Sequence, residues 1–132
     1  MSSYNPYFED RIMGRVRGEL ILGQQSKPYL KKGKSLTHYR VRLFVETQNP
    51  KISCVIYRLE PSRYDSVLES LDASGQFDVI VTTYGDCFVT VDVQIEGELI
   101  RKVALLSLLL QESHATSADR HLETAIREIA EN

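Results

Sequence analysis

Two short segments of the chain gather side chains that can recognise a ligand. The first reads Leu59-Glu60-Pro61-Ser62-Arg63-Tyr64, and the second reads Thr83-Tyr84-Gly85-Asp86. Aromatic faces can stack on flat groups, and hydroxyl groups can both donate and accept hydrogen bonds. A plainer interpretation stays open for the first segment. Ser62 after Pro61 is also a common turn former, and a Glu60–Arg63 pair at the surface would be worth little energy.

The histidines and cysteines form no catalytic or metal-binding pattern. His38, His114 and His121 are scattered along the sequence, and the last two lie near or within a predicted C-terminal helix, where surface positions are expected. The chain has no Gly-x-Ser-x-Gly, His-Glu-x-x-His or Cys-x-x-Cys motif. Cys54 and Cys87 lie in apolar surroundings, so we expect two free, buried thiols. We therefore predict no catalytic residue, no metal site and no cofactor.

The two segments are placed among strands by the hydrophobic pattern. Alternating apolar and polar residues predict strands over 39–45, 52–59, 77–83 and 87–95. In the last of these, Val89, Val91 and Val93 point to one face, while Thr90 and Asp92 point to the other. This pattern is typical of a sheet with one face in the core and one face in water. Tyr57, Leu59, Phe77, Val79 and Val81 are accordingly expected to be core residues rather than ligand contacts.

The two ends of the chain are predicted as follows. Residues 2–8 form a loose arm, residues 12–22 form a first strand and residues 24–36 form a polar connection. Residues 99–111 fit either structure, because their leucines favour a helix while their place after a turn at 96–98 favours a last buried strand. We expect the strand. Residues 118–130 carry an apolar stripe and predict a helix capped by Thr116 or Ser117; the stripe is Leu122, Ala125, Ile126 and Ile129.

Together the strands and the two segments resemble the YEATS domain family, in particular its prokaryotic group. In that family the first loop reads roughly Leu-His-Pro-Ser-Phe and the second roughly Gly-Trp-Gly-Glu-Phe. Ser62 keeps the hydroxyl of the first loop, Tyr84 keeps the aromatic residue of the second, and Gly85-Asp86 match the turn. Glu60, Arg63, Thr83 and Cys87 depart from the pattern. Tyr64 supplies the missing ring if the loop conformation shifts by one residue.

The resemblance implies a fold and a function. The implied fold is an all-β, immunoglobulin-like β-sandwich of seven or eight strands with a C-terminal helix. In residues 64–72, Val67, Leu68 and Leu71 have helical spacing, but the resemblance implies an extended or irregular crossover, which we expect. Residues 1–113 would be the sandwich domain with its N-terminal arm, and residues 114–132 the helix. The implied function is non-catalytic recognition of a peptide or of a modified, for example acylated, lysine side chain. The implied binding residues are Glu60, Ser62, Arg63, Tyr64, Tyr84, Gly85 and Asp86.

A second hypothesis is a scaffold or oligomer-forming adaptor in a bacterial multi-component system, such as a defence system, without acyl-lysine binding. Residues 103–110 or the helix 118–130 would then make the protein contact, and a homo-oligomer is one form of it. In either case we expect a protein or peptide partner. The net charge of -2 argues against a nucleic-acid partner. The longest apolar run, 103–110, is too short to span a bilayer, and residues 1–10 do not read as a signal peptide, so we expect a cytoplasmic protein.

Overall fold

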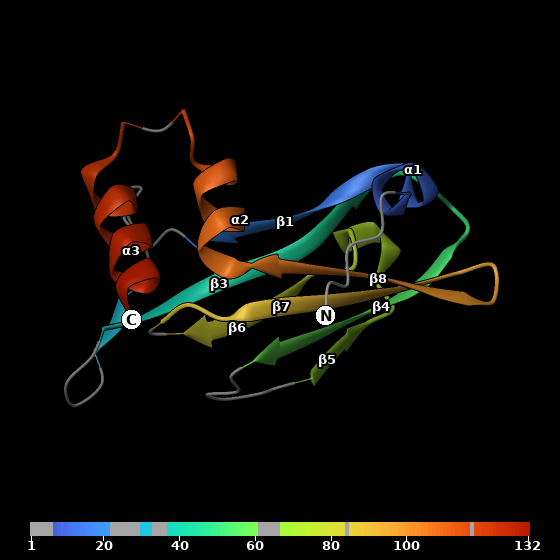
Figure 1. The fold of residues 1–132 in the computed structure, drawn as a ribbon, viewed down its shortest axis with the longest axis horizontal. Helices are drawn as coiled ribbons and strands as arrows, with labels where there is room; N and C mark the ends of the chain where they lie inside the picture. The colour runs from blue at the N-terminus through green and yellow to red at the C-terminus, as the bar shows by residue number, and fades with distance from the viewer. Residues whose placement is uncertain (1–6, 22–29, 33–36, 61–66, 84, 117) are drawn as a thin grey trace.

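The computed structural model describes residues 7–21, 30–32, 37–60, 67–83, 85–116 and 118–132 (Figure 1). Within these ranges the chain forms eight strands, arranged as two antiparallel sheets, together with three α-helices and one short 3-10 turn. In chain order they are α1 (Phe8–Ile12), β1 (Gly14–Leu20), β2 (Leu30–Lys32), β3 (Thr37–Thr47), β4 (Ile52–Glu60), β5 (Val67–Ser70), η2 (Ala73–Gly75), β6 (Val79–Thr83), β7 (Phe88–Ile95), β8 (Glu98–Leu105), α2 (Leu106–Ser113) and α3 (Arg120–Glu131).

The first sheet is built around the long strand β3. Tyr39 pairs with Leu30 of β2 on one side and with Thr83 of β6 on the other. Further along, β1 pairs with residues 41–47 of β3, on the side away from β6. β1 and β2 therefore follow one another along the same edge of β3. The polar connection predicted over 24–36 is wrong at Leu30–Lys32, because these residues add a strand to this edge.

The second sheet has the order β5-β4-β7-β8. β7 and β8 form a hairpin whose turn residues, Glu96 and Gly97, both have positive φ. Such two-residue turns match the twist of the strands they connect, and the turn predicted at 96–98 is confirmed. The extended crossover implied for residues 64–72 is confirmed where the structure describes it, since Val67–Ser70 is a strand paired with β4.

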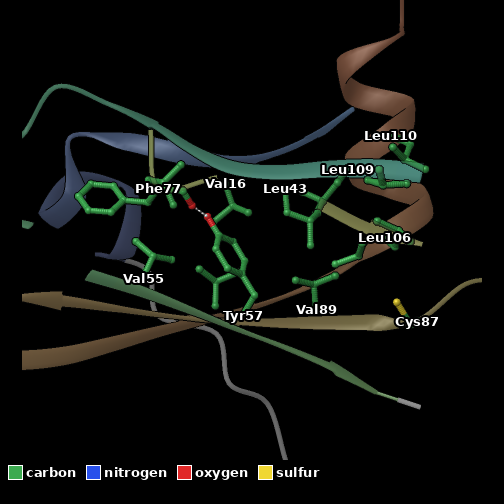
Figure 2. Close-up of a cluster of buried hydrophobic side chains, with 14 of the residues drawn as sticks. Val16, Leu43, Val55, Tyr57, Phe77, Cys87, Val89, Leu106, Leu109 and Leu110 are labelled. Carbon is green, nitrogen blue, oxygen red and sulfur yellow. Dashed lines mark hydrogen bonds between the residues drawn. The ribbon is translucent and has the colours of Figure 1, made fainter. Parts of the chain in front are cut away.

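The two sheets pack face to face and bury one contiguous apolar core, so the predicted immunoglobulin-like sandwich is confirmed. Val89, Val91 and Val93 are fully buried, as the alternation predicts. Between the sheets, the Tyr57 hydroxyl donates a hydrogen bond of 2.6 Å to the carbonyl oxygen of Phe77 (Figure 2). This bond satisfies a polar group that burial would otherwise leave unpaired.

Three predicted boundaries are wrong, and in each case a local backbone feature explains the difference. Phe8 belongs to α1 and is fully buried, so it is not part of a loose arm. The first strand begins at Gly14 rather than at residue 12, because Ile12 ends α1 and Met13 has the left-handed φ of 55° that terminates the helix. The strand predicted from residue 77 begins at Val79, because Phe77 has a φ of 56°.

The largest correction concerns the strand predicted over residues 99–110. The chain is extended only to Leu105 and then continues as α2. Leu106, Leu109 and Leu110 have helical spacing and are buried against β1 and the inner face of the sandwich (Figure 2). The helix comes so close to β1 that a Cβ added at Gly18 would lie 3.3 Å from the Cβ of Leu109. The segment therefore forms a strand up to Leu105 and a helix from Leu106 onward.

Helix α3 packs on α2 at the end of the sandwich opposite α1 (Figure 1). The predicted stripe is confirmed, since Leu122, Ala125 and Ile129 are buried and Ile126 packs against the core. The predicted cap is wrong: the Asp119 carboxylate accepts a hydrogen bond of 2.8 Å from the backbone N–H of His121. None of the helices in the described ranges has the length and apolar composition needed to cross a membrane.

Side chains from the two helices also bond to the first sheet. The Tyr39 hydroxyl donates to the Glu128 carboxylate of α3. The expected surface position of His114 is wrong, because its Nε2 accepts a hydrogen bond of 3.2 Å from the backbone N–H of Leu20. Burial lowers the pKa of His114, which favours the neutral ring that this bond requires. His121 is exposed, as expected.

Truncation of two leucines in α2 tests its place in the core. We expect Leu106→Ala to lower the free energy of unfolding by about 2–5 kcal/mol, because it leaves a cavity in a packed interior. Leu108, on the same helix, is 57% exposed, and Leu108→Ala should change stability by less than about 0.5 kcal/mol. Urea unfolding of both variants measures the difference. Equal effects would contradict the helical packing of this segment.

Candidate functional site

The first loop segment follows β4 of the second sheet, and the second segment connects β6 of the first sheet to β7 of the second. β4 ends at Glu60, and its register partner on the neighbouring strand is Phe88, the first residue of β7. The chain that follows Glu60 and the chain that precedes Phe88 therefore start from adjacent points at the same end of the sheet. β5 begins at the same end, since Val67 pairs with Arg58. The register thus brings together the ends of two segments that are more than twenty residues apart in the sequence.

Three of the predicted site residues are described by the structure. Glu60 is exposed at the end of β4, Gly85 is buried, and Asp86 is partly buried. The other four, Ser62, Arg63, Tyr64 and Tyr84, lie outside the described residues. The β4–β7 register places Glu60 opposite Phe88, two residues after Asp86 in the chain.

A threonine holds the base of the second loop. Thr83 is 5% exposed, and its Oγ1 donates a hydrogen bond of 2.6 Å to the carbonyl oxygen of Gly85. The same Oγ1 accepts a bond of 3.2 Å from the Gly85 N–H. Side-chain bonds of this kind close a turn locally. In the sequence, Thr83 departs from the family pattern. It precedes Gly85 by two residues, a spacing at which a threonine side chain can close a turn.

Asp86 bonds to the first turn of α2. Its Oδ1 accepts hydrogen bonds from the backbone N–H of Cys87 at 3.0 Å and of Ser107 at 2.9 Å. Its Oδ2 accepts a bond of 2.7 Å from the Ser107 hydroxyl. The carboxylate therefore acts as a helix cap supplied from a distant part of the chain, where it also meets the positive end of the helix dipole. Sequence reasoning missed Ser107, because no local pattern connects two residues so far apart.

Phe88 presents an aromatic ring beside the two loops. It is 55% exposed and faces outward between Glu60 of β4 and Leu105 of β8. Its parity in β7 opposes that of the buried Val89, so the alternation already indicates its outward direction. Sequence reasoning did not include it among the site residues.

Asp92, on the same outward face, forms ion pairs with Arg58 and Arg101. Its carboxylate is almost fully buried and accepts bonds from Arg101 at 2.7 and 3.1 Å and from Arg58 at 3.5 Å. Burial alone would raise the pKa of Asp92, but the bonds from the two guanidinium groups outweigh it and hold the pKa below its ordinary value. Asp92 is therefore a charged structural residue.

The expected state of the cysteines is confirmed, since Cys54 and Cys87 are both buried and form no disulfide. Burial raises the pKa of the Cys54 thiol, which keeps it protonated. Across the described ranges no three His, Cys, Asp or Glu side chains cluster in a way that could hold a metal ion.

A shallow hollow of about 580 Å³ lies at the opposite end of the sandwich, away from the loop segments. It is lined by Met13, Gly14, Glu46, Thr47, Gln48, Asn49, Pro50 and Gln76. Two of its polar side chains, Thr47 and Asn49, already have partners. The Thr47 hydroxyl donates to the carbonyl oxygen of Ile12, and the Asn49 amide nitrogen donates to that of Arg11.

Replacing Thr83 tests the base of the second loop. Thr83→Val keeps the shape of the side chain but leaves the Gly85 N–H without its partner in a buried position. We expect a loss of about 1–3 kcal/mol in the free energy of unfolding. Thr82→Val, on the neighbouring and less buried residue, is the matched control and should have a smaller effect. Thermal unfolding compares the two, and a control that costs as much as Thr83→Val would contradict this role.

Comparison with known proteins identifies the stretch that carries both loops. Residues 39–101 match the prokaryotic YEATS domain family, and the match runs from β3 into β8. Searches of curated proteins and of solved structures gave no significant match. The segments 59–64 and 83–86 both fall inside the matched stretch, as does the β4–β7 pair that sets their distance. The predicted resemblance to the prokaryotic YEATS domain family is therefore confirmed over residues 39–101.

Proposed function

We propose that the protein is a non-catalytic recognition module that binds a peptide, and within it a modified lysine side chain, at the end of the second sheet. YEATS-family domains are reader modules that bind protein or peptide partners. The observation that carries the proposal is the register of Glu60 with Phe88, which starts both loops from adjacent points. An acylated lysine is the first candidate, because its flat amide suits both stacking and hydrogen bonding.

In this proposal each loop residue has a distinct task. Tyr84 offers the stacking face, Ser62 offers a hydroxyl to the amide, and Tyr64 offers the second ring. Gly85 lets the backbone come close to the ligand, while Glu60 and Arg63 select the charge of the flanking peptide. Phe88 adds an exposed ring beside Glu60 at the rim of the same surface.

The packing supports recognition over the scaffold hypothesis. In the scaffold hypothesis, the leucines of residues 103–110 would make the contact between subunits. Leu106, Leu109 and Leu110 are instead buried in the core of their own chain. The apolar stripe of α3 is likewise covered by its own chain, with Leu122 and Ile129 buried. We further propose a bacterial cytoplasmic setting, consistent with two cysteines that form no disulfide.

Titration calorimetry with lysine peptides tests the proposal. Peptides that carry acetylated, crotonylated or unmodified lysine, otherwise identical, are titrated into the full chain. We expect binding of an acylated form in preference to the unmodified one. Tyr84→Ala should weaken it by about 1–3 kcal/mol through lost aromatic contact, and Ser62→Ala by about 1 kcal/mol for a neutral hydrogen bond.

Tyr7→Ala is the control, because Tyr7 is exposed near α1, at the far end of the molecule. It should leave the affinity unchanged. No heat of binding with any of the peptides would remove the acyl-lysine proposal and leave the fold intact. An affinity that Tyr7→Ala lowers as much as Tyr84→Ala would place the binding surface elsewhere.

A further inference from the structure

The second loop is bonded to helix α2 as well as to the strands that flank it. We propose that Ser107, acting through Asp86, is a positioning residue that sets the conformation of the second loop for recognition. The inference deepens the proposed function and rests on it for its purpose, although the positioning itself can be measured without a ligand. Its basis is the set of bonds that joins residues 86 and 87 to the start of α2.

Both oxygens of the Asp86 carboxylate are engaged. Oδ1 accepts from the backbone N–H groups of Cys87 and Ser107, and Oδ2 accepts from the Ser107 hydroxyl. The Leu106 N–H donates a further bond of 2.9 Å to the carbonyl oxygen of Cys87. Ser107 is only 3% exposed, so rotation of Asp86 away from it would leave buried polar groups unpaired. These bonds hold the loop in one arrangement relative to α2.

Helix α2 is itself held in place by the core and by β1. Leu106, Leu109 and Leu110 are buried in the core, and the Arg17 Nε donates a bond of 3.3 Å to the Ser113 hydroxyl at the far end of the helix. His114, just beyond the helix, accepts the bond from the Leu20 N–H. The loop is thus joined to β6 and β7 by the chain itself and to α2 by the bonds of Asp86 and Cys87.

A loop that is already held in one conformation loses less conformational entropy when a ligand binds. The binding free energy is therefore more favourable. The engagement of both oxygens also means that Asp86 has little capacity left to contact a ligand directly. We therefore assign Asp86 and Ser107 to positioning, and leave direct contact to the other loop residues.

Hydrogen exchange at the amides of residues 85–88 measures the positioning without a ligand. Asp86→Ala removes all three bonds of the carboxylate, and Ser107→Ala removes only the hydroxyl bond. Asp86→Asn keeps an acceptor for the two N–H groups and offers its NH₂ to the Ser107 oxygen, so it should rescue the loop. Asp119→Ala is the matched control, because it removes the same kind of cap from α3.

We expect amide exchange at residues 85–88 to accelerate about tenfold in Asp86→Ala and about fivefold in Ser107→Ala. These factors correspond to the net free energy that ordinary hydrogen bonds contribute to local stability. Asp86→Asn should stay near wild type, and Asp119→Ala should not affect these amides. The core amides of residues 89–93 report on global opening and should accelerate less than the loop. Unchanged exchange at 85–88, or equal acceleration in the loop and the core, would overturn the proposal. If Asp86→Ala does not fold, the exchange rates of Ser107→Ala and Asp86→Asn test the proposal in its place.

The same variants are then titrated with the acetyl-lysine peptide. Ser107→Ala should weaken binding about threefold to tenfold, because the loop must now be ordered on binding, while Asp119→Ala should not weaken it. Faster loop exchange with unchanged affinity would overturn the role in recognition. If the wild-type chain binds no peptide, the proposed function fails, and the exchange experiment still decides whether Ser107 positions the loop.

Discussion

The antiparallel pairing of β4 with β7 organises both the core and the candidate site. The pair runs from Ile52 opposite Ile95 to Glu60 opposite Phe88 and lies at the centre of the second sheet. Apart from the register shift between Ile52 and Cys54, alternate residues of each strand point into the sandwich, so a slip by one residue would turn the buried set outward. The same register also determines where the two loops leave the sheet. Stability and the geometry of the candidate site therefore depend on one set of backbone hydrogen bonds.

The change from strand β8 to helix α2 at Leu105 is the second constraint. A strand that continued to residue 110 would leave the space beneath β1 without side chains to fill it. The helix fills this space with leucines, and its first turn receives the Asp86 carboxylate from the second loop. One short helix thus completes the core and supports the loop. This arrangement explains why residues outside the matched stretch 39–101 bear on the site within it.

Much of the sheet structure could be predicted, because strands buried on one face leave a period of two in the sequence. The strands over 39–45, 52–59 and 87–95 were found in this way. Helix α2 could not be predicted, since a leucine-rich run is compatible with strand and helix until its packing partners are known. For the site, sequence pattern located both loops but not the partner of Asp86. The bond from Ser107 depends on tertiary packing, which periodicity does not contain.

The central claim is that a lysine-containing peptide binds at the end of the β4–β7 pair. Backbone amide chemical shifts, recorded by NMR during titration of the uniformly labelled chain with the acetyl-lysine peptide, test it most directly. We expect the largest changes at residues 59–64 and 83–88, with smaller ones at the start of α2. Changes confined to the hollow around Thr47 and Asn49, or to the outward faces of the sheets, would contradict the account.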